Sequence, residues 1–148
     1  MNKSDLPEKI KILFLCTGNS CRSQIAEGFA RYYGGNRLEV YSAGVMPVGV
    51  HPLAAQVMKE ISIDISNQYS KDIDEVRDVK PDIVITLCDY AQSLCPDFAG
   101  ASCKEHWPTF DPSQTYGTQD ELLPRFRKTR DELGERIKAF LEAHLLPR

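Results

Sequence analysis

The sequence of 148 residues lacks any long hydrophobic run. Its apolar stretches have the length of single strands, whereas a helix that spans a bilayer needs roughly 20 consecutive apolar residues. The first nine residues are polar and do not resemble a secretory signal peptide. We therefore expect a cytoplasmic protein with a single domain over residues 1–148, in which residues 1–9 form a flexible N-terminal extension.

A concentration of positive charge is also missing. The 18 lysines and arginines are scattered along the chain, and 21 acidic residues bring the formal net charge to −3. Proteins that bind nucleic acids usually gather basic residues on one face, because they must neutralise phosphates. We therefore expect small anions and other proteins as partners, with no nucleic acid and no membrane.

Closely spaced zinc-binding cysteines are absent from the second half of the chain. Cys88, Cys95, Cys103 and His106 could in principle form a metal site. However, zinc sites usually contain a tight Cys-x2-4-Cys pair, and no two of these three cysteines have that spacing. We expect no resident metal. In a reducing compartment, five cysteines are more typical of catalytic or redox chemistry than of structural disulfides.

Strand-like and helix-like segments alternate along the chain, without repeats or linkers. Apolar or alternating patterns predict strands at residues 10–15, 38–42, 82–87 and 104–107. Helical spacing predicts helices near residues 23–33, 52–61, 73–76, 89–94 and 120–145. This alternation predicts an α/β fold: a three-layer sandwich in which helices flank a four-stranded parallel sheet.

The most informative segment follows the first predicted strand. Cys16 ends the strand, and Arg22 stands six positions later at the start of a predicted helix. Such a strand, loop and helix can aim backbone N–H groups and the positive end of the helix dipole at one anion. A cysteine at the same point has its thiolate favoured, so Cys16 is the candidate nucleophile. The predicted oxyanion-binding residues are Thr17, Gly18, Asn19, Ser20, Cys21 and Arg22.

Several side chains of this loop have candidate roles. The planar guanidinium of Arg22 matches a tetrahedral oxyanion. Ser23 is either a hydrogen-bond donor to the sulfur of Cys16 or an ordinary serine at a helix start. Asn19 either holds a left-handed loop conformation or is a simple turn residue. We expect Cys21 to pack in the structure rather than to react.

A second candidate element is Asp111, followed by Pro112. A carboxylic acid near the anion loop could protonate a departing oxygen, and the proline would stiffen the segment that presents it. Asp-Pro is also a common pair in turns, so on its own it is weak evidence for a catalytic acid and needs support from the rest of the site. The histidines are less informative: we interpret His51 and His144 as loop and surface residues, and His106 as a packing or hydrogen-bonding residue of the fourth strand.

Cys88 and Cys95 form a third element. On a helix, residues seven positions apart share a face, but their Cα atoms are roughly 10.5 Å apart. A disulfide needs Cα atoms within about 7 Å, so the two cysteines could bond only if the intervening helix unwinds. The alternatives are two small buried side chains or half of a metal site. Cys103 is a spare thiol in every case.

These elements together resemble the thioredoxin-coupled arsenate reductases built on the low-molecular-weight protein tyrosine phosphatase fold. The resemblance extends from Lys11 to beyond Arg136. Ordinary phosphatases of this fold lack the later cysteine pair and commonly have paired tyrosines near the Asp-Pro loop, where this chain has Trp107 and Phe110. The matching segments are residues 16–24, 41–44, 63–68, 86–88, 95–96, 105–107 and 111–112.

The resemblance implies a role in arsenic resistance and detoxification. In such a reaction, Cys16 forms a thiol-arsenate adduct while Asp111 acts as the acid, and a relay through Cys88 and Cys95 ends in a disulfide that thioredoxin reduces. Phosphate and sulfate would compete with arsenate, and the protein would act as a monomer with no bound cofactor. The alternatives are reduction by glutaredoxin, a tyrosine or small-ester phosphatase, and a catalytically idle oxyanion-binding module.

The resemblance also raises the question of a cation. Some family members bind potassium beside the catalytic loop through residues that correspond to Asn19, Ser42 and an aspartate. Lys71 occupies the position of that aspartate in this chain, and Asp72 follows it. A lysine ammonium can take the place of the cation, so we expect potassium to have little effect.

Overall fold

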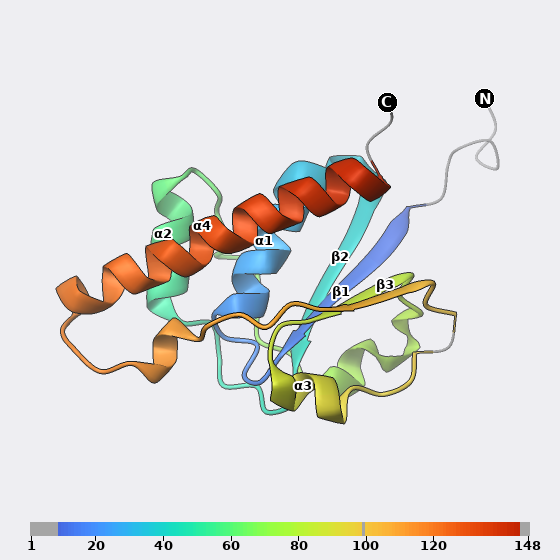
Figure 1. Ribbon diagram of the computed structural model, residues 1–148, viewed down its shortest axis with the longest axis horizontal. Helices are drawn as coiled ribbons and strands as arrows, with labels where there is room; N and C mark the ends of the chain where they lie inside the picture. Colours follow the sequence, from blue (N-terminus) through green and yellow to red (C-terminus); the bar gives the residue numbers. More distant parts are fainter. Residues whose placement is uncertain (1–8, 99, 146–148) are drawn as a thin grey trace.

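The structure is a computed structural model that describes residues 9–98 and 100–145 (Figure 1). Its parallel sheet has the strand order β2-β1-β3-β4. The strands are β1 (Ile10–Cys16), β2 (Leu38–Gly44), β3 (Ile83–Thr86) and β4 (Cys103–His106). The predicted α/β fold with four parallel strands is therefore confirmed. Most of the predicted N-terminal extension, residues 1–8, lies outside the described residues.

The five predicted helices are present, with ends that differ by no more than three residues, and two short helical segments at residues 35–37 and 112–114 come in addition. They are α1 (Arg22–Gly34), η2 (Gly35–Arg37), α2 (Pro52–Glu60), η3 (Ile73–Val79), α3 (Asp89–Leu94), η4 (Pro112–Gln114) and α4 (Gln119–His144). The last of them begins at a capping box, in which Thr118 and Glu121 satisfy each other's backbone N–H groups. No helix in residues 9–98 or 100–145 is long and apolar enough to cross a membrane.

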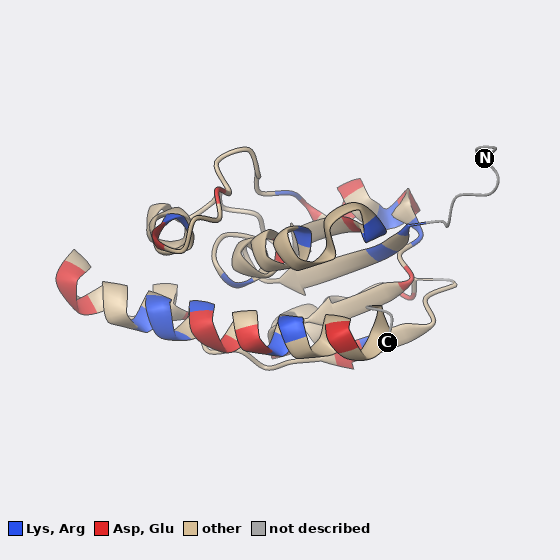
Figure 2. Ribbon diagram, turned by 90° about the horizontal axis from the view of Figure 1, so that it is seen from above, with Lys and Arg blue, Asp and Glu red and all other residues tan. Residues whose placement is uncertain are grey.

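Two hydrophobic cores lie on opposite faces of the sheet. Successive side chains of a strand point to opposite faces, so Ile12 and Phe14 pack with α1, α2 and α4. Leu13 and Leu15 pack with η3 and α3 on the other face. Figure 1 shows α4 lying across α1, and Figure 2 shows charges of both signs along α4. The molecule is therefore the predicted three-layer sandwich.

The fold brings the functional segments together at the carboxyl edge of the sheet. Cys16 ends β1, and Cys88 follows the neighbouring β3 by two residues. The end of β2 also approaches closely here, because a Cβ atom on Gly44 would lie 2.7 Å from the backbone oxygen of Thr17 and from the backbone nitrogen of Asn19. Glycine at this position thus allows β2 to support the loop after β1.

Candidate active site

The loop between β1 and α1 is oriented by residues 46–51, which run beside it. Three carbonyl groups of the loop accept hydrogen bonds from backbone N–H groups of this segment, at 2.9 to 3.0 Å. In the described part of the chain, the backbone N–H groups of residues 17–21 have no acceptor. The loop borders a cavity of about 250 Å³. Unpaired N–H groups at the start of α1 give this cavity the character of an anion site.

Cys16 lies at the base of this cavity with only 2% of its surface exposed. The Oγ atom of Ser23 is 2.8 Å from the Cys16 sulfur, and it accepts a hydrogen bond of 2.7 Å from the Asn19 amide. Since Asn19 fills an acceptor position of the hydroxyl, the hydroxyl hydrogen is free to point at the sulfur. Asn19 has the predicted left-handed backbone conformation, with a φ of 46°.

Arg22 and Asp111 meet at the same cavity although they are far apart in the sequence. The guanidinium of Arg22 lies 3.2 Å from a carboxylate oxygen of Asp111 and also donates to the backbone oxygen of Thr109. Ser113 holds the other carboxylate oxygen through its backbone N–H and its hydroxyl, at 3.0 and 2.6 Å. The structure therefore places a fixed cation and a carboxyl group beside the candidate nucleophile.

Cys21 also borders the cavity but is chemically different from Cys16. Burial strongly raises the pKa of the Cys21 thiol, and the negative charges of Asp111 and Cys16 raise it further. Its side chain is 3% exposed and belongs to the core on the α1 face. Cys21 therefore remains a thiol and packs in the structure, as the sequence predicts.

The second sulfur borders the same loop. Cys88 caps the N-terminus of α3, where its sulfur accepts a hydrogen bond of 3.4 Å from the backbone of Ala91. The same sulfur lies 3.2 Å from the hydroxyl of Thr17, which is the residue after Cys16. Two cysteines from neighbouring strands thus flank one loop, as expected from the meeting of parallel strand ends.

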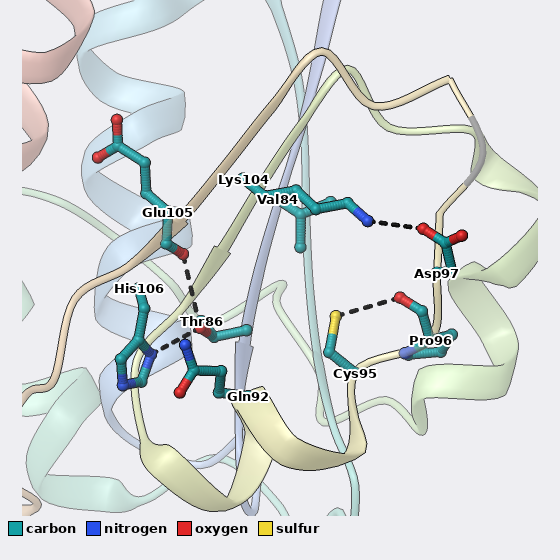
Figure 3. A pocket seen from close by; sticks show the side chains of 9 residues that line it. All are labelled: Val84, Thr86, Gln92, Cys95, Pro96, Asp97, Lys104, Glu105 and His106. Carbon is teal, nitrogen blue, oxygen red and sulfur yellow. Dashed lines mark hydrogen bonds and ion pairs between the residues drawn. The ribbon is translucent and has the colours of Figure 1, made fainter.

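The third sulfur lies at the other end of α3 (Figure 3). The Cys95 thiol donates to the backbone oxygen of Pro96 at 3.4 Å and borders a second cavity of about 470 Å³ between α3 and β4. Burial raises the pKa of this thiol, and the ammonium group of Lys104 opposes the shift. All five cysteines are free. Because α3 separates Cys88 from Cys95, a bond between them requires its unwinding.

Few contacts hold α3 in place. Ala91 is its one buried residue. Two contacts connect the flanks of α3 to β4, a hydrogen bond between His106 and Asp89 and an ion pair between Lys104 and Asp97, each at 2.8 Å. The two carboxylates are 90% and 95% exposed. Such exposed contacts add little to stability, so α3 can open at a small cost in free energy.

The residues of the expected cation site meet in a buried network. The side chain of Asn19 accepts a hydrogen bond from the backbone of Lys71 and donates to Ser42, at 2.8 and 2.9 Å. Ser42 donates to Glu27, whose carboxylate lies 3.7 Å from the Lys71 ammonium. Burial lowers the pKa of Lys71, and the charge of Glu27 opposes that shift. Sequence reasoning missed Glu27, because its position inside a helix gives no sign of this contact.

His51 lies in a loop, as the sequence predicts, but it is partly buried rather than a simple surface residue. His51 caps the N-terminus of α2 and borders the cavity that contains Cys16. The following Pro52 is a typical first residue of a helix and could have indicated the cap. Nothing in the sequence shows that residues 46–51 run beside the anion loop. His106 is a hydrogen-bonding residue, as predicted: its Nδ1 atom lies 2.7 Å from the hydroxyl of Thr86 on β3.

The structure also shows how the later cysteines and His106 are arranged. Within residues 9–98 and 100–145, no three His, Cys, Asp or Glu side chains lie together so that they could hold a metal ion. Cys103 instead faces the carboxylate of Glu105, with its sulfur 3.9 Å from an oxygen. Burial, followed by the charge of Glu105, raises the pKa of the Cys103 thiol.

The chain is similar in sequence to proteins of a known family. Residues 11–146 match the family described as low molecular weight phosphotyrosine protein phosphatase. The chain belongs to this family. Among its relatives is an arsenate reductase of Halalkalibacterium halodurans, which is 50% identical over 131 residues, or 88% of this chain and 94% of the relative. An arsenate reductase of Bacillus subtilis is 48% identical over the same coverage.

Solved structures of this phosphatase family have the same fold. A structure described as an arsenate reductase in the phosphate binding state has a TM-score of 0.77 and 36% identity, covering 90% of this chain and 98% of its own. A low molecular weight protein tyrosine phosphatase from T. tengcongensis has a TM-score of 0.75 and 25% identity, covering 91% and 99%. The family fold therefore carries proteins named for two different reactions.

Proposed function

We propose that this phosphatase-family protein reduces arsenate to arsenite and that Cys16, Cys88 and Cys95 form its disulfide relay. The observation that carries the proposal is the second thiol at the anion loop: the sulfur of Cys88 lies 3.2 Å from the hydroxyl of Thr17. A phosphatase needs one nucleophile, because water releases its product. A second cysteine at the same loop can instead supply the electrons for a reduction. The names of the close relatives support this choice.

In the first step, the Cys16 thiolate attacks the arsenic atom of arsenate, which the loop N–H groups and Arg22 hold. A sulfur–arsenic bond forms and an arsenic–oxygen bond breaks. The departing oxygen takes a proton from Asp111, which borders the same cavity, and leaves as water. The product is a Cys16 thiol-arsenate adduct in which arsenic is still in its oxidised state.

In the second step, the Cys88 thiolate attacks the sulfur of Cys16. The sulfur–arsenic bond breaks, and its electron pair goes to arsenic, which leaves as arsenite. The two cysteines lose these two electrons and form a Cys16–Cys88 disulfide. The 3.2 Å contact between the Cys88 sulfur and the hydroxyl of Thr17, the residue after Cys16, supports this step.

In the third step, Cys95 attacks Cys88 and releases the Cys16 thiolate for another cycle. Burial raises the pKa of the Cys95 thiol while α3 is folded, so unwinding both brings the sulfurs together and increases the thiolate fraction of Cys95. The weak anchoring of α3 permits this movement. The relay uses one chain and free thiols, so we propose a monomer that works in the cytoplasm.

We propose thioredoxin as the reductant, because an opened segment that holds a Cys88–Cys95 disulfide offers it an accessible bond. Arsenate turnover is to be measured with thioredoxin, its reductase and NADPH, and in parallel with glutathione and glutaredoxin. We expect repeated turnover with the thioredoxin system and about background rates with glutaredoxin. Faster turnover with glutaredoxin would overturn this part of the proposal.

Hydrolysis of small phosphate esters is a second candidate activity. Cys16, Arg22 and Asp111 together suffice for it, and a cavity that binds one tetrahedral oxyanion accepts another of similar charge and size. However, binding of an aromatic phosphate ester would require aromatic side chains at the cavity, against which its ring could pack. Trp107 is 2% exposed and packs in the core, which leaves the exposed Phe110 as the aromatic residue beside Asp111. We therefore propose that the hydrolysis of small phosphate esters is a residual activity of this protein.

We further propose that potassium is dispensable. The ammonium group of Lys71 already brings a positive charge to the Glu27 carboxylate, 3.7 Å away and on the network that holds Asn19. Replacing sodium chloride by potassium chloride at equal ionic strength is expected to leave the melting temperature and the arsenate turnover unchanged. A large rise of either quantity in potassium would show that a cation is still needed.

A further inference from the structure

His51 is held rigidly against the anion loop. Its backbone N–H donates to the carbonyl of Ser20 at 3.0 Å. Its Nδ1 atom accepts a hydrogen bond of 3.0 Å from the backbone N–H of Leu53, which makes the imidazole the cap of α2. The ring also packs on Phe126, with 4.8 Å between the ring centroids. These three contacts fix the position of the imidazole relative to the loop.

The cap also determines where the imidazole carries its proton. A nitrogen that accepts a hydrogen bond has no hydrogen of its own, so the neutral ring carries its proton on Nε2. Burial lowers the pKa of His51, and the negative charge of Asp111 only opposes the shift. Both observations favour the neutral ring, which has Nε2–H as a donor.

This donor has no acceptor within the described part of the protein. Across residues 9–98 and 100–145, no acceptor is bonded to Nε2 of His51, and this atom is not among any buried polar atoms that lack a partner. Nε2 is therefore open to solvent. His51 borders the cavity of about 250 Å³ that Cys16, Arg22 and Asp111 also border. His51, which lines the anion site, thus has a donor without a protein acceptor.

We propose that His51 is an oxyanion-binding residue that donates its Nε2–H to the substrate. This inference rests on the proposed function, because it requires a tetrahedral oxyanion in the cavity. The loop N–H groups and Arg22 belong to the segment that follows Cys16 and would bind the oxyanion from there. His51 adds a neutral donor from the start of α2. A hydrogen bond to a charged oxygen is stronger than one between neutral groups, so the donor contributes measurably to affinity.

Two substitutions of His51 distinguish the role of Nδ1 as the helix cap from the role of Nε2 as the donor. In His51→Asn, the amide oxygen replaces Nδ1 as the helix cap, and the reach of Nε2 is lost. In His51→Gln, the amide nitrogen occupies the approximate position of Nε2, and the cap is lost. His144→Asn is the matched control, because His144 lies at the end of α4 and does not border the cavity.

The probe is inorganic sulfate, which keeps the same charge across neutral pH and cannot be reduced by the thiols. Its binding is measured as protection of Cys16 from iodoacetamide, followed on the peptide that contains Cys16. We expect His51→Asn to raise the sulfate concentration for half-protection by about tenfold, with an unchanged melting temperature. We expect His51→Gln to bind nearly as the wild type does and to melt about 3 °C lower.

The outcomes distinguish this inference from the proposed function. Equal protection of His51→Asn and the wild type would overturn the role of His51 and leave the arsenate chemistry intact. Equal weakening in both variants would also overturn it, because it would show that only the shape of the imidazole matters. If sulfate fails to protect even the wild type, the oxyanion site itself is wrong, and both proposals fail.

Discussion

Replacing Cys16 by serine is expected to abolish arsenate reduction. A serine hydroxyl is a far weaker nucleophile than a thiolate, and it cannot form the sulfur–arsenic bond or the disulfide that follows. We expect a loss of about 10⁴-fold or more in turnover, down to background, because the nucleophile takes part in every step. Arsenite formation with thioredoxin, its reductase and NADPH measures the effect.

The Cys16→Ser variant should remain folded and should still bind anions. The side chains are similar in size, and the loop N–H groups and Arg22 are unchanged. A melting temperature near that of the wild type, together with sulfate binding detected by calorimetry, is the control for folding. If the variant kept more than a small part of the turnover, Cys16 would not be the nucleophile.

Replacing Cys95 by serine is expected to stop repeated arsenate reduction without affecting the hydrolysis of phosphate esters. The first two steps use Cys16 and Cys88, so the variant should release about one arsenite per protein and then stop as the Cys16–Cys88 disulfide. Repeated turnover should fall by about two orders of magnitude or more, because Cys16 is buried and thioredoxin reaches it poorly. Any hydrolysis of a small phosphate ester should be unchanged.

Cys103→Ser is the matched control for this experiment. Cys103 lies on β4 and, like Cys95, is partly buried with a raised pKa, but the relay does not use it. We expect wild-type turnover from this variant. Undiminished turnover of Cys95→Ser would contradict the relay and would favour direct resolution of the adduct by a small thiol.

The sequence predicts those parts of the site that depend on local pattern. The apolar strand before Cys16 and the permissive residues Gly18 and Asn19 predict a strand, a tight loop and a helix without any knowledge of the rest of the chain. The meeting of Cys16 with Cys88 also follows from the sequence, because both residues come after buried parallel strands. The structure brings both to one loop.

The sequence does not predict contacts that depend on how distant loops pack. Residues 46–51 contain no catalytic motif, and their position beside the anion loop comes from backbone hydrogen bonds that any residue type can make. The sequence therefore places His51 in a loop but does not predict its contact with the anion loop. Glu27 was missed for a similar reason: its carboxylate reaches Ser42 and Lys71 only after β2 and α1 have packed together.

The central claim is that three sulfurs act in sequence. It is tested most directly by mass spectrometry of the fully reduced protein after treatment with arsenate in the absence of any reductant. The relay predicts a disulfide between Cys88 and Cys95, with Cys16 again a free thiol and arsenite released in about equal amount. Release of arsenite with Cys88 and Cys95 both still reduced would contradict the account.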